Sequence, residues 1–191
     1  MMGAGKTTIG HLLAAKLGYQ FFDTDTLIEQ VAGQSVTQIF AESGEAAFRQ
    51  LETQVLAELS PYTRLAIATG GGIVLKRENW GYLRHGIVVW FDVSIEQLCD
   101  RLQNDQTRPI LSRPGEEDLA TRLKMLSEQR QPLYAQADIH IAVLPNDSPD
   151  AIAERTIATI AQSCEKKLAA TKALDRFNRE APYHAQDQIS D

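Results

Sequence analysis

The sequence predicts a three-layer α/β/α domain built on a parallel sheet. Short β-rich runs alternate with amphipathic helical runs, which is typical of parallel strands joined by helical crossovers. The strand candidates are continuous apolar runs, as in a sheet that helices cover on both faces. A glycine-rich segment opens the first helix with no strand before it, so the first strand of the sheet is expected to be missing.

The helices are predicted from apolar residues at helical spacing. In the first one, Ile9, Leu13 and Leu17 share a face, and Gly18 follows as a C-terminal cap. The helix that begins near residue 45 stops before Pro61, which cannot continue it. The predicted helices span residues 8–17, 27–31, 36–40, 45–59, 95–102, 119–131 and 151–160.

The predicted strands are short and rich in apolar, β-branched or aromatic residues. They span residues 19–22, 65–68, 87–91 and 138–143. A polar stretch with two prolines separates two of the helices, and we expect residues 107–118 to form a lid. Residues 1–162 are predicted to be one domain. Residues 163–191 lack a sustained apolar period and are expected to be a polar, partly helical and weakly ordered tail.

Composition excludes several classes of protein. The chain has 191 residues, 43% of them hydrophobic, which is enough for one domain with a core. A net charge of −6 argues against a general nucleic-acid binder. No apolar run is long enough to cross a bilayer. The two cysteines, Cys99 and Cys164, indicate neither a disulfide framework nor a metal site, so we expect reduced thiols in a cytoplasmic protein. We also expect a monomer.

The chain opens on a candidate phosphate-binding loop, the end of the pattern G-x-x-x-x-G-K-[ST]. Glycines let backbone N–H groups approach phosphate oxygens, and the following helix points its positive end at the same anion. A lysine then adds a charge for the outer phosphates, and the first threonine is the usual Mg²⁺ ligand. Six residues alone would also allow a plain turn before a helix. The segment reads Gly3-Ala4-Gly5-Lys6-Thr7-Thr8.

The front of this pattern is absent. Its first glycine would stand one residue before Met1, and the strand that should aim the loop would precede it. We expect a truncated or mis-assigned start, with Met1 or Met2 an internal methionine. The alternative is a true short form, which we expect to be unstable and poorly active.

Two carboxylates, Asp23 and Asp25, follow the first strand candidate. Strand ends of an open α/β sheet converge on the ligand crevice. One carboxylate could hold the Mg²⁺ shell through water, and the other could orient or deprotonate an attacking hydroxyl. The alternative is a pair of aspartates that cap the next helix.

Two further features suggest substrate contacts. Arg49 could clamp a substrate carboxylate with its two-pronged guanidinium, or it could be a solvated arginine paired with Glu45. Three consecutive glycines, Gly70, Gly71 and Gly72, follow a strand, where a ligand could touch the backbone. They could also form a simple tight turn.

Two arginines open proline-containing motifs later in the chain. Arg108 stands in the predicted lid, where a cation could offset charge on a transferring phosphoryl group. Arg130 stands near the end of the predicted helix over residues 119–131, in the segment Arg130-Gln131-Pro132-Leu133-Tyr134.

Taken together, these motifs resemble the shikimate kinase family. The resemblance covers about residues 1–160, and the later motifs are more specific than the phosphate loop, which many nucleotide kinases share. It implies a P-loop, nucleoside-monophosphate-kinase-like fold with a five-stranded parallel sheet. The matching segments are GAGKTT (3–8), FDTD (22–25), GEAAFR (44–49), ATGGG (68–72), RPIL (108–111) and RQPLY (130–134).

The resemblance also implies an activity, the Mg²⁺-dependent transfer of the ATP γ-phosphoryl group to the 3-hydroxyl of shikimate. It assigns ATP phosphates to the glycine loop and Lys6, and Mg²⁺ to Thr7 with Asp23 nearby. It implies that Asp25 binds the shikimate hydroxyls and acts as a base, and that Arg49 and Arg130 bind the shikimate carboxylate. Gly70, Gly71 and Gly72 would form the wall of the shikimate pocket. Arg108 would be the arginine of the lid, and Arg101 would pack on the adenine ring.

Two other functions stay open on sequence grounds. A related small-molecule kinase, such as a gluconate kinase, would have no carboxylate clamp. A non-catalytic relative would be expected to lose Lys6, Thr7 or Asp25, and all three are present.

Overall fold

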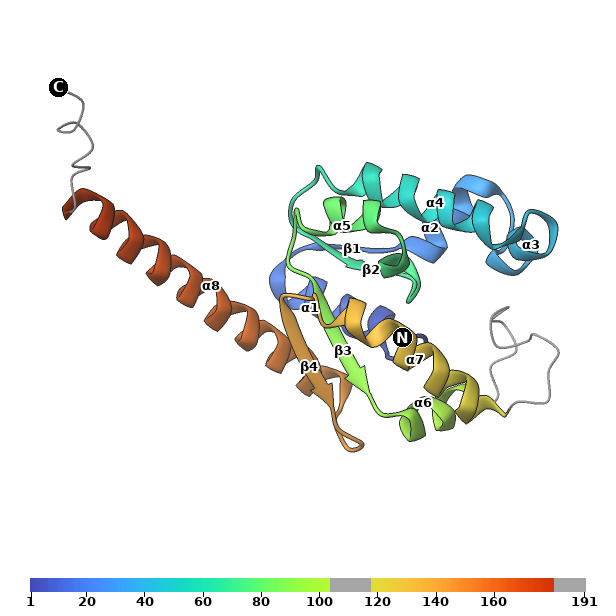
Figure 1. Ribbon diagram of the computed structural model, residues 1–191. Coiled ribbons are helices and arrows are strands. Elements are labelled where there is room, and N and C mark those ends of the chain that lie inside the picture. Colours follow the sequence, from blue (N-terminus) through green and yellow to red (C-terminus); the bar gives the residue numbers. More distant parts are fainter. Residues whose placement is uncertain (104–117, 181–191) are drawn as a thin grey trace, which may run out of the picture.

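The computed structural model describes residues 1–103 and 118–180, and for residues 174–180 it describes the backbone alone. Helices and strands alternate as the sequence predicts (Figure 1). The strands are β1 (Gln20–Asp23), β2 (Leu65–Ala68), β3 (Val89–Val93) and β4 (Ile139–Val143). The helices are α1 (Lys6–Leu17), α2 (Thr24–Ala32), α3 (Val36–Glu42), α4 (Gly44–Leu59), α5 (Arg77–Leu83), α6 (Ile95–Leu102), α7 (Leu119–Tyr134) and α8 (Pro149–Glu180), with a 3-10 turn η1 (Ile73–Leu75).

The prediction of parallel strands is confirmed. β1 pairs with β2, Gln20 opposite Leu65, and β3 pairs with β4, Val89 opposite Ile139. The strands form two separate pairs rather than one continuous sheet, and the described residues contain four strands where the resemblance implies five. Residues 1–5 form no strand, so within the described chain no strand bridges β2 and β3.

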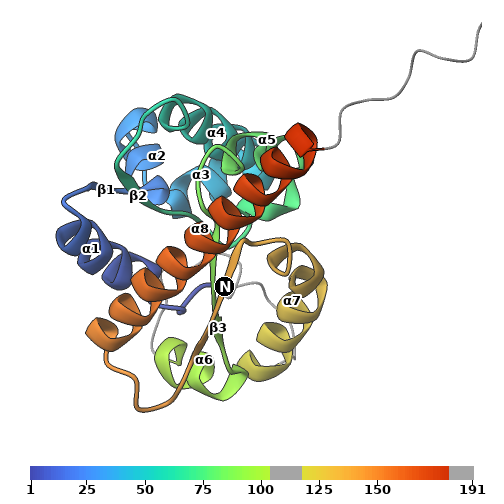
Figure 2. The same cartoon turned by 90° about the vertical axis from the view of Figure 1, so that its left-hand side faces the viewer.

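Two hydrophobic cores correspond to the two strand pairs. One core joins α2, α3 and α4 through residues such as Ile28, Ile39 and Phe48. The other joins β3, β4, α6 and α7, includes Phe91 and Leu123, and extends to Leu56 of α4, to η1 and to α5. Figure 2 shows β1, β2 and α2 to α5 gathered on one side, and β3, α6 and α7 on the other. A ligand site between the two groups would therefore draw side chains from both cores.

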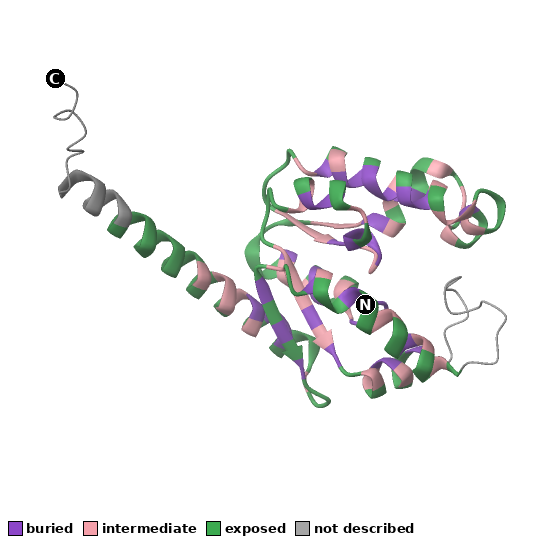
Figure 3. Ribbon diagram, viewed as in Figure 1, coloured by how far each residue is buried: buried purple, intermediate pink, exposed green. Residues whose placement is uncertain are grey.

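Helix α8 continues beyond the end that its apolar period predicts. The sequence predicts a helix over residues 151–160, whereas α8 runs from Pro149 to Glu180. Its first half packs on α1 and β4, and its second half projects from the rest of the protein and is exposed where side chains are described (Figure 3). The added turns are rich in alanine, lysine and leucine, which favour helix without tertiary contacts. No helix in the described chain is long and apolar enough to span a lipid bilayer.

Candidate functional site

Residues 3–5 form a glycine loop that leads directly into α1. Gly3 and Gly5 have φ angles of 71° and 81°, which residues with a side chain rarely adopt. Gly5 is the N-cap of α1, so the first N–H groups of the helix point into the loop without intrahelical partners. Ala4 is buried, and the outer face of the first turn exposes Thr7 and Thr8. This arrangement can hold an anion such as a phosphate.

The hydroxyl of Thr7 and the carboxylate of Asp23 lie side by side at this loop. Thr7 Oγ1 donates to Asp23 Oδ2 at 2.7 Å. Asp23 also caps α2, because its Oδ1 accepts from the backbone N–H of Asp25 at 3.0 Å. Asp23 therefore caps a helix and also lies beside the phosphate loop, so both interpretations of this residue fit the structure. The ammonium of Lys6 donates to the carbonyl oxygen of Met1 at 2.7 Å.

These oxygens suit Mg²⁺ as partial ligands. Mg²⁺ prefers hard oxygen donors and usually keeps waters and phosphate oxygens in its shell. In residues 1–103 and 118–180 there is no group of three or more His, Cys, Asp or Glu side chains that could hold a metal by themselves. A divalent ion at Thr7 and Asp23 would therefore be shared with the phosphates of a nucleotide.

A cavity of about 410 Å³ lies between α2, α4, α7 and the glycine turn that follows β2. It is lined by Asp25, Arg49 and Arg130, which come from three different helices. Lys6 does not line the cavity, but Met2 does, so the cavity begins beside the glycine loop. The glycine turn supplies Gly70, Gly71 and Gly72 to the same wall.

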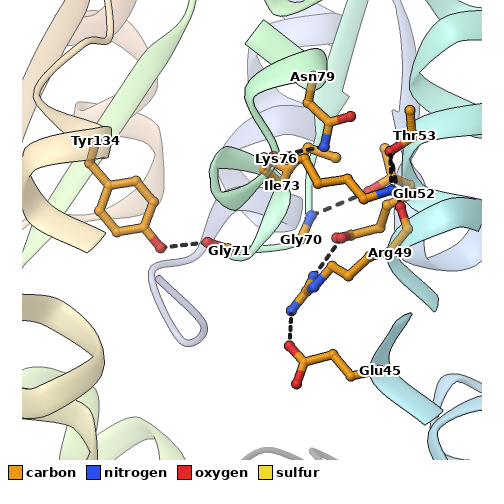
Figure 4. A network of polar contacts seen from close by, with 11 residues as sticks. Glu45, Arg49, Glu52, Thr53, Gly70, Gly71, Ile73, Lys76, Asn79 and Tyr134 are labelled. Carbon is orange, nitrogen blue, oxygen red and sulfur yellow. Dashed lines mark hydrogen bonds and ion pairs between the residues drawn. The ribbon is translucent and has the colours of Figure 1, made fainter. Parts of the chain in front are cut away.

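Arg49 is buried in the wall of this cavity. Only 8% of its surface is exposed, so the interpretation as a solvated arginine is wrong, although the expected pair with Glu45 is present at 3.1 Å. Its other terminal nitrogen donates to Glu52, one turn further along α4, whose side chain is fully buried (Figure 4). Glu52 and Glu45 therefore hold the guanidinium from two directions.

Burial and charge act in opposite directions on this pair. Burial raises the pKa of the Glu52 carboxyl, and the attraction of Arg49 offsets only part of that rise. The negative charge of Asp25 adds to the increase. Burial alone would lower the pKa of Arg49, but the two glutamates raise it above its ordinary value, so the arginine stays protonated.

Arg130 enters the cavity from α7 and is only 3% exposed. Its Nε atom is buried and has no hydrogen-bond partner within the described chain, and the same holds for Oε1 of Glu52. A buried polar group without a partner costs free energy, so such atoms in a cavity wall indicate a place for a polar ligand. Two guanidinium groups beside Asp25 suit a small anion that also carries hydroxyls.

The glycine turn is crowded rather than strained. A Cβ on Gly70 would overlap the carboxylate of Glu52, and a Cβ on Gly72 would overlap the guanidinium of Arg49. The φ angle of Gly72 is −93°, which any residue can adopt. Glycine leaves room here for the charged ends of α4 side chains, which would have to shift if a Cβ were added.

One candidate nucleotide contact in the described chain lies outside this cavity. Arg101, at the end of α6, donates from Nη1 to the carbonyl oxygen of Gly3 at 3.0 Å, which places it at the phosphate loop. Arg108 and almost all of the predicted lid lie outside the described residues.

Sequence reasoning missed Glu52, which lies on the buried face of α4 one turn after Arg49. The available signal was helical spacing, because Glu52 shares this face with the buried residues Val55, Leu56 and Leu59. An acid on an apolar helix face needs a partner, and the preceding arginine was the natural candidate.

Comparison with known proteins identifies relatives over most of the chain. A family model described as "Shikimate kinase" matches residues 2–161. The shikimate kinase of Trichormus variabilis is 55% identical over 160 residues, which cover 84% of this chain and 87% of that protein. The shikimate kinase of Nostoc punctiforme is 54% identical over 160 residues, with the same coverage of both chains.

Solved structures agree with the sequence relatives. A shikimate kinase from Acinetobacter baumannii in complex with shikimate has a TM-score of 0.79 and 36% identity, and the match covers 84% of this chain and 89% of that one. A shikimate kinase from Bacteroides thetaiotaomicron has a TM-score of 0.77 and 33% identity, covering 84% of this chain and 94% of that one. The predicted fold class is confirmed by these similarities.

Proposed function

Since this chain belongs to the shikimate kinase family, we propose that its cavity is the shikimate site and its glycine loop the ATP site. The enzyme is an ATP-dependent kinase that phosphorylates shikimate, on the route to chorismate and the aromatic amino acids. The observation that supports the site assignment is the shared cavity of Asp25, Arg49 and Arg130 beside the phosphate loop.

The nucleotide would bind at the start of α1. Backbone N–H groups of the loop and the positive end of α1 would face the phosphates. Lys6 would leave the Met1 carbonyl and place its charge against the outer phosphates. Arg101, which donates to the Gly3 carbonyl, would contact the nucleotide beside the loop, and Arg108 would offset charge on the transferring group. The proposed ATP contacts are Gly3, Ala4, Gly5, Lys6, Thr7, Thr8, Arg101 and Arg108.

Shikimate would bind through its carboxylate and its hydroxyls. Arg49 and Arg130 are two buried cations, and a carboxylate between them would supply partners for their N–H groups. Asp25 would accept a hydrogen bond from the reacting hydroxyl and take its proton as the phosphoryl group transfers. Gly70, Gly71 and Gly72 would let the ring approach the backbone.

Mg²⁺ would be held by the Thr7 hydroxyl, with Asp23 contacting its water shell. When bound, the ion neutralises phosphate charge during transfer. We also propose that the enzyme acts as a monomer in the cytoplasm.

A coupled assay of ADP release tests this proposal. Shikimate and gluconate are compared side by side at equal concentrations with ATP and Mg²⁺. We expect ADP release with shikimate and almost none with gluconate, because a rigid ring presents its carboxylate and hydroxyls at fixed positions, whereas ordering the open chain of gluconate in the cavity costs more free energy. Release with gluconate alone would contradict the proposed substrate site.

A further inference from the structure

The hydroxyl of Tyr134 reaches from the end of α7 to the glycine turn. Tyr134 Oη donates to the carbonyl oxygen of Gly71 at 2.6 Å. Figure 4 shows that Tyr134 approaches the turn from the side opposite to Arg49 and Glu52. The tyrosine is 7% exposed, and its ring packs near Trp90 of β3 with centroids 5.9 Å apart.

The two arginines of the cavity come from helices that pack mainly in different hydrophobic cores. Arg49 is next to Phe48, which packs in the core of α2, α3 and α4. Arg130 is on α7, whose Leu123 and Tyr134 pack in the core of β3 and β4. Leu56 of α4 also packs in the core of α7, so the separation of the arginines depends on this apolar packing and on the contacts at the glycine turn.

The glycine turn is in contact with both helices. On one side, Gly72 lies so close to Arg49 of α4 that a Cβ would overlap the guanidinium. On the other side, a Cβ on Gly71 would lie 3.3 Å from Oη of Tyr134, which is a tight contact. One short backbone segment thus touches α4 and α7, and the Tyr134 hydrogen bond is a polar link from this segment to α7.

The phenol is well suited to hold a fixed position. A tyrosine ring has few rotatable bonds, and here the ring is buried near Trp90. Burial raises the pKa of Tyr134, so the hydroxyl remains a donor at neutral pH even though the positive charge of Arg130 acts the other way. Arg130 precedes Tyr134 by one helical turn, so both side chains lie on one face of α7.

We propose that Tyr134 is a positioning residue that sets the separation of Arg49 and Arg130 by holding the carbonyl of Gly71. The inference rests on the proposed function, in which both arginines grip the shikimate carboxylate. Without the hydroxyl, the turn and α7 can shift apart, and two guanidinium groups no longer reach one carboxylate with good geometry.

Tyr134→Phe tests this, since it keeps the ring and removes only the hydroxyl. We expect the KM for shikimate to rise about 3- to 10-fold, while the KM for ATP changes less than about twofold. Tyr62→Phe is the matched control, because Tyr62 is 69% exposed, and neither KM should change. In an Arg130→Ala background, Tyr134→Phe should add less than about twofold, since the spacing no longer matters.

Equal increases in both KM values, or penalties that add fully to that of Arg130→Ala, would show a merely structural role and overturn the inference. If Tyr134→Phe does not fold, Gly71→Ala crowds the same contact from the other side, and its increase in the KM for shikimate should shrink to less than about twofold in an Arg130→Ala background. If the wild type is active and Tyr134→Phe has the same KM for shikimate, the role of Tyr134 is overturned and the proposed function is not. A wild type that releases no ADP with shikimate overturns the proposed function as well.

Discussion

Arg49 and Glu52 form an ion pair in the wall of the cavity, one turn apart on α4, with the carboxylate fully buried. The glutamate fixes the direction of the guanidinium before any ligand arrives. Because Glu52 also lies against the glycine turn, the pair connects the clamp to the wall of the site.

Glu52→Gln should therefore weaken the clamp. The amide keeps the shape but removes the charge that holds Arg49, and we expect the KM for shikimate to rise about 10-fold with little change for ATP. Glu45→Gln is the matched control, because Glu45 contacts the same guanidinium from a more exposed position and should have a smaller effect. Steady-state kinetics with each substrate varied in turn measure both, and equal effects of the two variants would contradict a special role for Glu52.

The same substitution should have a pH-dependent effect on stability. The pKa of Glu52 in the folded protein is raised above 4.5, so its contribution to stability is fully present below that pH and is lost as pH rises through the folded pKa. Glutamine cannot ionise, so the stability of Glu52→Gln relative to wild type should improve as pH rises. Urea unfolding of both proteins, below pH 4.5 and at neutral pH, measures this difference in stability. If Glu52→Gln instead became less stable relative to wild type as pH rises, the attraction of Arg49 would have a larger effect on the pKa of Glu52 than burial has.

Gly72→Ala should displace Arg49, because the new Cβ would overlap the guanidinium. We expect weaker shikimate binding and lower stability, by about 1–3 kcal/mol for the crowding. Gly81→Ala is the control: it lies within α5, its Cβ would meet no atom within 4 Å, and it should be neutral or stabilising. Thermal unfolding and the KM for shikimate distinguish the two, and a Gly72→Ala variant that behaves like Gly81→Ala would refute the crowding argument.

Asp25→Asn should abolish turnover while sparing ATP binding, because the amide cannot accept the proton of the reacting hydroxyl. Nucleotide binding is measured by fluorescence titration, and turnover by ADP release. Asp150→Asn, on the surface at the start of α8, should leave both unchanged. Near-normal turnover of Asp25→Asn would remove Asp25 from the mechanism.

Much of the fold was predictable because the apolar period is strong where elements are buried. β2 and α6 have the predicted bounds, residues 65–68 and 95–102. The helix α5 and the turn η1 were missed, since they depend on tertiary contacts: the side chains of Asn79 and Trp80 donate to the carbonyls of Ile73 and Val74. The 7 residues of α5 carry too little local signal to predict such a helix.

In the site, sequence reasoning named the residues with distinctive motifs, and the structure brings Asp25, Arg49 and Arg130 to one cavity. It missed a role for Tyr134, because the partner of its hydroxyl, Gly71, is distant in sequence. It missed Glu52, because this acid lies on the buried face of α4 and is part of no motif. Their roles and those of the named residues stay predictions until the variants are measured.

The central claim is that two arginines from different helices grip the shikimate carboxylate, and Arg130→Ala tests it most directly. Lys124→Ala, an exposed cation on the same helix, is the control. Steady-state kinetics should show a KM for shikimate raised at least about 10-fold by Arg130→Ala and a KM for ATP that is nearly unchanged, with neither affected by Lys124→Ala. An equal increase for both substrates, or none for shikimate, would contradict the claim.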